Sequence, residues 1–202
     1  MARRYWTADF HIGMEEIIGY ENRPFSSILD MNNAFLDSCQ DLNPEDTIIH
    51  IGDLFCYNRP NKPAEFINKI PATFINIRGN HDLNNKVKPI CESMHFFLSK
   101  RYPYVSVSHY PTYDQKISRD CLTAPIHLCG HVHSKWKHCL DLDHNILNIN
   151  VGIDAWNYKL VQEEELIVYL NYLFKQNPDD LVRCKKNEYG SLKFFGLKTK
   201  KI

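Results

Sequence analysis

The sequence lacks any run of apolar residues that approaches the roughly 18 needed for a membrane-spanning helix. The opening "MARRYW" is basic, but "TADFHIG" follows where a secretory signal would have an apolar stretch. We therefore expect the chain to stay in the compartment where it is made. This predicts a cytoplasmic protein without a membrane partner.

Paired cysteines and a dominant charge are also missing. The seven cysteines form no CxxC pair and are odd in number, so we interpret them as reduced thiols. Lys and Arg total 24, as do Asp and Glu, so no net charge attracts nucleic acid or an anionic membrane. The apolar share of 44% in 202 residues is instead typical of a globular domain with a sizeable core.

Five short segments share one pattern, a β-branched or aromatic run that ends in a polar cluster. They are residues 3–11, 47–53, 73–82, 104–111 and 125–133, and each run is typical of a strand. Helical patterns at 26–40 and 62–70 lie between the early ones, and alternating strands and helices predict an α/β domain. Two further strands are expected at 136–142 and 144–152, and an amphipathic helix at 161–175.

The composition changes near the end of the chain, where six lysines oppose one acid after Arg183. We therefore expect a domain over residues 1–175 and a basic C-terminal extension over 176–202, packed on the domain. Its aromatic residues raise the alternative of a nucleic-acid contact through charge and stacking. We favour a solvated or packed terminus, as is usual for charge runs.

Seven polar side chains that can bind metal stand at or just beyond the ends of the five predicted strands: Asp9, His11, Asp53, Asn80, His109, His131 and His133. Side chains two apart on a strand share one face, so the pairs in "DFH" and "HVH" could each chelate a cation. The set holds carboxylate, imidazole and amide but no thiolate, which suits Mn²⁺, Fe or Mg²⁺, with Zn²⁺ as an alternative. Seven donors exceed one tetrahedral ion, and two ions that share a carboxylate are typical of phosphoryl displacement.

The order "DFH", "GD", "GNHD", "SHYP" and "GHVH" resembles that of the calcineurin-like metallophosphoesterase superfamily. The similarity spans about residues 5–158, because "IIGYENRPF" and "NVGIDAWNY" also resemble stretches of its small bacterial and phage members. It implies a four-layer α/β/β/α sandwich, two mixed sheets flanked by helices. It also implies two divalent ions, for which we expect Mn²⁺ first and Fe, Zn, Mg or Ni as alternatives. The ligands would be Asp9, His11 and His133 for one ion, Asn80, His109 and His131 for the other, and Asp53 as the bridge.

The resemblance further implies a mechanism in which metal-bound hydroxide attacks phosphorus and His81 protonates the leaving oxygen. We expect Asp82 to tune or orient His81, and Arg78 or Arg23 to bind phosphate oxygens. Either arginine could equally be a surface or structural ion-pair residue.

The predicted function is that of a metal-dependent hydrolase, a phosphodiesterase or phosphatase, which acts on a small or nucleotide-like phosphate ester. Cys56, Tyr57 and Asp82 stand where the protein phosphatases of the superfamily have Asp, Arg and Glu, which disfavours that branch. Met14 replaces a histidine that similar proteins often carry. The alternatives are a non-catalytic protein-binding scaffold with the same fold, and a nuclease that uses the basic extension.

Overall fold

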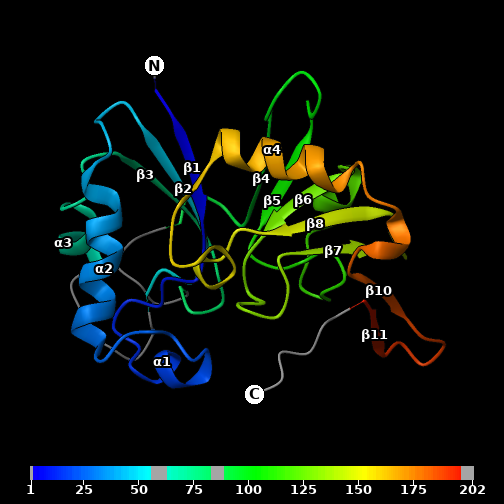
Figure 1. The fold of residues 1–202 in the computed structure, drawn as a ribbon, viewed down its shortest axis with the longest axis horizontal. Helices are drawn as coiled ribbons and strands as arrows, with labels where there is room; N and C mark the ends of the chain where they lie inside the picture. The colour runs from blue at the N-terminus through cyan, green and yellow to red at the C-terminus, as the bar shows by residue number, and fades with distance from the viewer. Residues whose placement is uncertain (1, 56–62, 83–88, 197–202) are drawn as a thin grey trace.

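The computed structural model describes residues 2–55, 63–82 and 89–196, which form two β-sheets flanked by helices (Figure 1). The smaller sheet has the strand order β3-β2-β1-β9. Its first three strands are parallel and β9 is antiparallel to β1. Their bounds are β1 (Arg4–Thr7), β2 (Thr47–Ile51), β3 (Thr73–Ile77) and β9 (Val161–Gln162).

The larger sheet has seven strands in the order β11-β10-β7-β8-β6-β5-β4. Strands β5, β6 and β8 are parallel, and β4, β7 and β11 pair antiparallel with their neighbours β5, β8 and β10. Both sheets are therefore mixed, and the predicted α/β class with two mixed sheets flanked by helices is confirmed. The bounds are β4 (Ser93–Phe96), β5 (Val105–Ser108), β6 (Ile126–Cys129), β7 (His138–Asp141), β8 (Ile146–Asn150), β10 (Arg183–Lys186) and β11 (Leu192–Phe195).

The described α-helices are α1 (Glu16–Tyr20), α2 (Ile28–Gln40), α3 (Pro63–Ile67) and α4 (Glu163–Leu173), and short 3-10 helices lie at Arg119–Thr123, Ile153–Trp156 and Pro178–Asp180. Helix α2 begins where expected, because the Ser27 side chain accepts a hydrogen bond from the Asp30 backbone N–H. It buries Met31 and Phe35 against the smaller sheet, on the side away from the larger one (Figure 1). None of the helices in the described ranges is long and apolar enough to cross a membrane.

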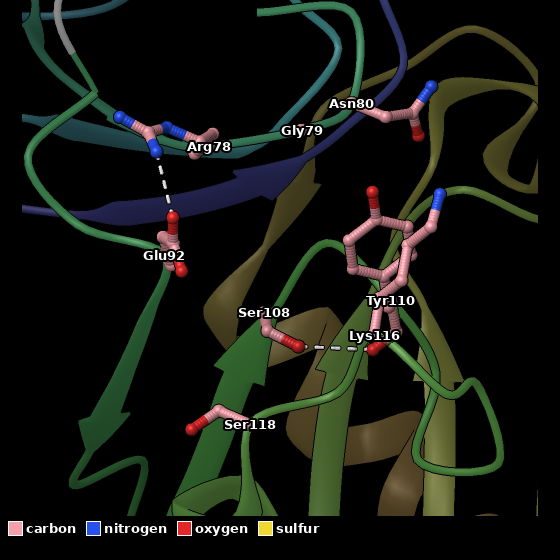
Figure 2. A pocket seen from close by; sticks show the side chains of 8 residues that line it. All are labelled: Arg78, Gly79, Asn80, Glu92, Ser108, Tyr110, Lys116 and Ser118. Atoms are coloured by element: carbon pink, nitrogen blue, oxygen red, sulfur yellow. Dashed lines mark hydrogen bonds and ion pairs between the residues drawn. The ribbon is translucent and has the colours of Figure 1, made fainter. Parts of the chain in front are cut away.

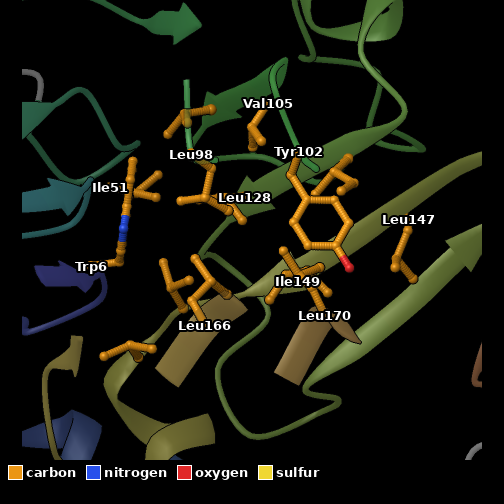
Figure 3. Packing of buried hydrophobic residues seen from close by; sticks show 14 of the residues in the cluster. Trp6, Ile51, Leu98, Tyr102, Val105, Leu128, Leu147, Ile149, Leu166 and Leu170 are labelled. Carbon is orange, nitrogen blue, oxygen red and sulfur yellow. The ribbon is translucent and has the colours of Figure 1, made fainter. Parts of the chain in front are cut away.

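The main core lies between the two sheets and is closed by α4 (Figure 3). Trp6 and Ile51 from the smaller sheet meet Leu128 and Ile149 from the larger, and Leu166 of α4 packs on the same cluster. Because the smaller sheet is covered on both faces, adjacent residues of its strands are buried on opposite sides. This explains why four successive residues of "TIIHI" are buried, rather than alternate ones.

The basic extension enters the larger sheet, since β10 pairs with β7 in parallel and β11 forms the edge beyond it. Cys184 of β10 is fully buried in one cluster with Cys139 of β7. The lysine-rich composition did not predict β10 and β11, and the sequence did not predict β4 either. The division into two domains at residue 175 stays a prediction.

Candidate metal centre

The predicted ligand segments meet where strands of both sheets end. Asp9, Asp53 and Asn80 follow the parallel strands β1, β2 and β3, so they reach the same edge of the smaller sheet. His109 follows β5 and His131 follows β6 in the larger sheet. A parallel bridge between Ala8 and Gly152 joins the two edges. Side chains from both sheets thus converge at one place, as expected for the carboxyl edge of parallel strands.

The reason for this convergence differs from the strand alternation that we expected. Five residues beyond the strand ends have left-handed backbone conformations, with φ of 62° at Asp9, 51° at His11, 58° at Asp53, 69° at His131 and 49° at His133. Each such residue other than glycine costs of order 1–3 kcal/mol. Sharp backbone turns therefore direct these side chains, so the expected reason, a shared strand face, is wrong. Asp9 and His11 nevertheless lie in one donor group, as expected.

One group of donors comprises Asp9, His11 and His133, with ligand atoms within 4.8 Å of one another. The His11 ring is buried, and neither of its nitrogens has a hydrogen-bond partner among the residues that the structure describes. Burial raises the pKa of Asp9 to about 6 and lowers that of His11 well below its usual value. A buried carboxylate beside a buried imidazole that makes no hydrogen bond with the described residues fits a cation-binding site.

A second group surrounds His109, which is completely buried. Its Nδ1–H donates to the Ile51 carbonyl at 2.9 Å, so Nε2 faces Asn80 Oδ1 at 3.1 Å and Asp53 Oδ2 at 3.2 Å. Both oxygens can only accept, so a proton on Nε2 or a bound cation must lie between these three atoms. Burial would lower the pKa of His109, but the carboxylates of Asp53 and Asp9 raise it to about 9.

Asp53 lies between the two groups. Its ligand atoms are within 4.8 Å of those of Asp9 and His109 on one side and of His11 and His81 on the other. Burial opposes its charge, but His109 and the other donors around it hold the pKa of Asp53 below its usual range. This position supports the bridging role that the family resemblance implies.

His131 contacts this cluster through its backbone as well as its ring. Its N–H donates to both oxygens of Asp9, at 3.0 and 3.1 Å. Its ring centroid lies 5.1 Å from that of His109, and burial followed by the charge of His109 lowers its pKa to about 4. His131 therefore packs against His109, and among the described residues the donor groups that contain His133 do not contain His131.

Asp154 contacts the donor cluster in a way that the sequence did not indicate. Its carboxylate accepts a hydrogen bond from His133 Nδ1 at 2.8 Å, so in the neutral imidazole the lone pair is on Nε2, the nitrogen that could bind a metal. Its position in "NVGIDAWNY", one of the stretches behind the family resemblance, was the available signal. Such carboxylates fix the orientation and tautomer of a ligating histidine.

Arg23 pairs with the same carboxylate, and its prediction as a phosphate ligand is wrong. Its Nε and Nη2 donate to the two Asp154 oxygens at 2.8 Å. The remaining donors bond to the carbonyls of Phe10 and Asp9 at 3.0 and 2.7 Å and to Met31 Sδ at 3.4 Å. All five N–H donors are used and the side chain is buried, so Arg23 stabilises the backbone beneath the centre.

His81 and Asp82 both contact the Asp53 segment, but through different groups. The His81 N–H donates to Asp53 Oδ1 at 2.8 Å, and its half-buried ring lies 4.9 Å from the His11 ring. The buried Asp82 carboxylate accepts backbone N–H groups of Asp53, Leu54 and Gly79 at 2.8, 3.1 and 2.9 Å. Asp82 therefore holds the Asp53 segment in place, while its predicted effect on the His81 ring stays a prediction.

A cavity of about 420 Å³ opens beside Asn80 (Figure 2). Arg78 lines it and is half-exposed, with Nη1 2.8 Å from Glu92 Oε1. Unlike that of Arg23, its side chain is accessible from a cavity, and its role in substrate binding stays a prediction. The other lining residues are Gly79, Ser108, Tyr110, Lys116 and Ser118.

An α/β protein with a buried Asp/His cluster able to bind metal is the class that this fold and site define. The chain belongs to the calcineurin-like phosphoesterase family, whose model matches residues 3–190. Members of this family are generally hydrolytic phosphoesterases with a dinuclear metal centre, and they act on phosphate esters.

One curated protein and one solved structure are similar to this chain. The uncharacterized protein MJ1445 of Methanocaldococcus jannaschii is 32% identical over 84 residues, which is 41% of this chain and 48% of that protein. This match thus spans about half of the relative's length. The crystal structure of AQ665 from Aquifex aeolicus, a protein of unknown function, aligns with a TM-score of 0.64 at 23% identity. It covers 84% of this chain and 100% of that one, and it supports the fold alone.

Proposed function

We propose that this protein is a phosphodiesterase or phosphatase that requires two divalent metal ions and acts on a small or nucleotide-like ester. The observation that carries the proposal is the position of Asp53 between two donor groups, one of which contains buried His11, whose ring nitrogens make no hydrogen bond within the described part of the chain. One ion would be held by Asp9, His11 and His133, the other by Asn80, His109 and His131, with Asp53 shared. The oxygen and imidazole donors favour Mn²⁺, with Fe, Zn, Mg or Ni as alternatives.

Two ions held by these residues would activate a water and would neutralise the charge that develops on the phosphate oxygens. The protein's own residues orient the ligands and supply the proton that the leaving oxygen needs. Asp154 holds the His133 ring through Nδ1, and Asp82 fixes the backbone of Asp53. His81 has a half-buried ring at the edge of the cluster, and in our proposal it donates its ring proton to the leaving oxygen.

The direct test is to add metal to metal-free protein and measure metal binding by calorimetry and hydrolysis of p-nitrophenyl and bis-p-nitrophenyl phosphate. Wild type should bind metal and hydrolyse at least one ester. His11→Ala should lose most of the metal affinity, whereas His95→Ala, at an exposed histidine of β4, should not. Absence of turnover by metal-loaded protein across a broad ester panel would refute the proposal and favour the scaffold alternative.

The role of His81 has its own test. His81→Ala should leave metal affinity unchanged and should slow esters with poor leaving groups by roughly 10²- to 10⁴-fold, the usual worth of a general acid. Esters of p-nitrophenol need little protonation and should slow much less. An equal loss for good and poor leaving groups would show that His81 is not the acid.

A further inference from the structure

The cavity beside Asn80 concentrates positive charge that the metal centre does not use. Arg78 follows β3, Lys116 lies in the loop after β5, and the one acid on the lining is Glu92. Two cations against one carboxylate leave one net positive charge in a cavity of about 420 Å³. That volume lies within the range of small-molecule sites.

The two cationic groups lie on different walls. Figure 2 shows Arg78 with Glu92 on one side of the cavity and Tyr110 with Lys116 on the other, below Asn80. Lys116 Nζ is 5.2 Å from the Tyr110 ring centroid, and among the described residues Lys116 has no ion-pair partner. The aromatic face thus holds this ammonium group without neutralising it.

The floor of the cavity is polar and well ordered by hydrogen bonds. Ser108 is buried, and its hydroxyl donates to the Tyr110 carbonyl at 3.0 Å and lies 3.2 Å from His127 Nε2. The Lys116 N–H donates to Asp114 Oδ1 at 2.8 Å, which closes the turn that carries Lys116. The charged and hydroxyl groups thus converge from segments that the fold fixes.

Arg78 can exchange its present partner for a ligand. Its contact with Glu92 is a surface ion pair between exposed side chains, with 43% and 74% of their areas accessible, and such pairs contribute little stability. A bound phosphate or carboxylate offers the guanidinium a bidentate partner in place of Glu92. Glu92 therefore opposes binding of an anion, while Lys116 and Arg78 favour it.

We propose that this cavity binds a second anionic group on the leaving group of the substrate. The substrate class is then a small phosphate ester that carries a further carboxylate or phosphate. This inference rests on the proposed function, because the cavity borders Asn80, which directly precedes the His81 assigned to the leaving oxygen.

The experiment compares esters that differ by one anionic group. The pairs are glycerol 2-phosphate with 2-phosphoglycerate, and glucose 1-phosphate with glucose 1,6-bisphosphate. Wild type should have the lower KM for the member with the extra anion in at least one pair, and the preferred pair distinguishes carboxylate from phosphate. Lys116→Met should raise that KM roughly ten-fold, as expected for loss of a charge-assisted contact, with under two-fold change for the partner.

Two further variants sharpen the comparison. Glu92→Gln should lower the KM of the ester with the extra anion, because it removes the carboxylate that competes for Arg78. Lys175→Met, at an exposed lysine just beyond α4, should change neither KM. Calorimetric binding of 2-phosphoglycerate to wild type and Lys116→Met gives the same comparison without turnover.

The outcomes separate this inference from the proposed function. Hydrolysis of p-nitrophenyl esters without a preference for the additional anion, or equal effects of Lys116→Met on both members of a pair, would overturn the inference alone. Failure to hydrolyse any ester would overturn the proposed function. If no ester is hydrolysed but wild type binds 2-phosphoglycerate and Lys116→Met binds it more weakly, the cavity is still assigned as an anion site.

Discussion

The buried pair of Arg23 and Asp154 should be essential for both stability and metal binding. Their side chains are 0% and 1% exposed, and two hydrogen bonds of 2.8 Å join them. Asp154→Asn keeps the size of the side chain but leaves the Arg23 charge without a carboxylate partner. Removing one member of a buried pair costs about 3–5 kcal/mol. At roughly 2–4 °C per kcal/mol for a chain of this size, Tm should fall by about 6–20 °C.

The same substitution acts on the metal centre through His133. Asp154 Oδ2 accepts the Nδ1–H of His133 at 2.8 Å, so its loss frees the ring to rotate or change tautomer. Loss of such a partner typically weakens metal affinity by about 10- to 100-fold. Arg23→Met leaves the contact between Asp154 and His133 in place, so it should destabilise the fold with a smaller effect on metal affinity.

A double-mutant cycle in urea, with metal affinity measured in parallel, checks this reasoning. The double variant Arg23→Met with Asp154→Asn should lose less stability than the sum of the single variants, because it leaves no unpaired charge. Asp37→Asn, on the exposed side of α2, is the matched control and should change stability by less than about 0.5 kcal/mol. Additive losses, or an unchanged metal affinity in Asp154→Asn, would refute the argument.

Two further predictions concern the backbone and pH. Gly79→Ala should abolish most metal binding and hydrolysis, since the added Cβ would overlap the Asp53 amide and carboxylate. In the control Gly19→Ala, in α1, the added Cβ meets no atom within 4 Å, and the substitution should stabilise the fold by about 0.5–1 kcal/mol. Equal metal affinities of the Gly79→Ala and Gly19→Ala proteins, measured by calorimetry, would contradict the prediction. The Arg3 guanidinium holds the pKa of Asp46 below its usual range, so this carboxylate contributes stability above about pH 4 that is lost as the pH falls through the folded-state pKa. Urea unfolding of Asp46→Asn between pH 7 and pH 2 should therefore show a smaller acid-induced loss of stability than wild type, and an unchanged loss would argue against it.

The sequence predicted the strands that carry the candidate site because their runs are buried and end in polar residues. Residues 47–53 and 73–82 contain β2 and β3 with Asp53 and Asn80 just beyond them. It did not predict β10 and β11, since a lysine-rich pair at the edge of a sheet lacks the usual apolar pattern. The predicted helix at 62–70 lies partly outside the described residues, and Cys56 and Tyr57 lie wholly outside them.

The sequence by itself determined the donor types, their order along the chain and, through the family resemblance, the kind of chemistry, because these depend on residue identity and strand ends. Only the tertiary structure decided which donors meet, since His131 and His133 have left-handed backbone conformations that no periodicity reveals. It also decided the role of Arg23. A guanidinium has the same chemistry in a core and in a substrate pocket, and the buried Asp154 opposite, 131 residues away, makes it structural.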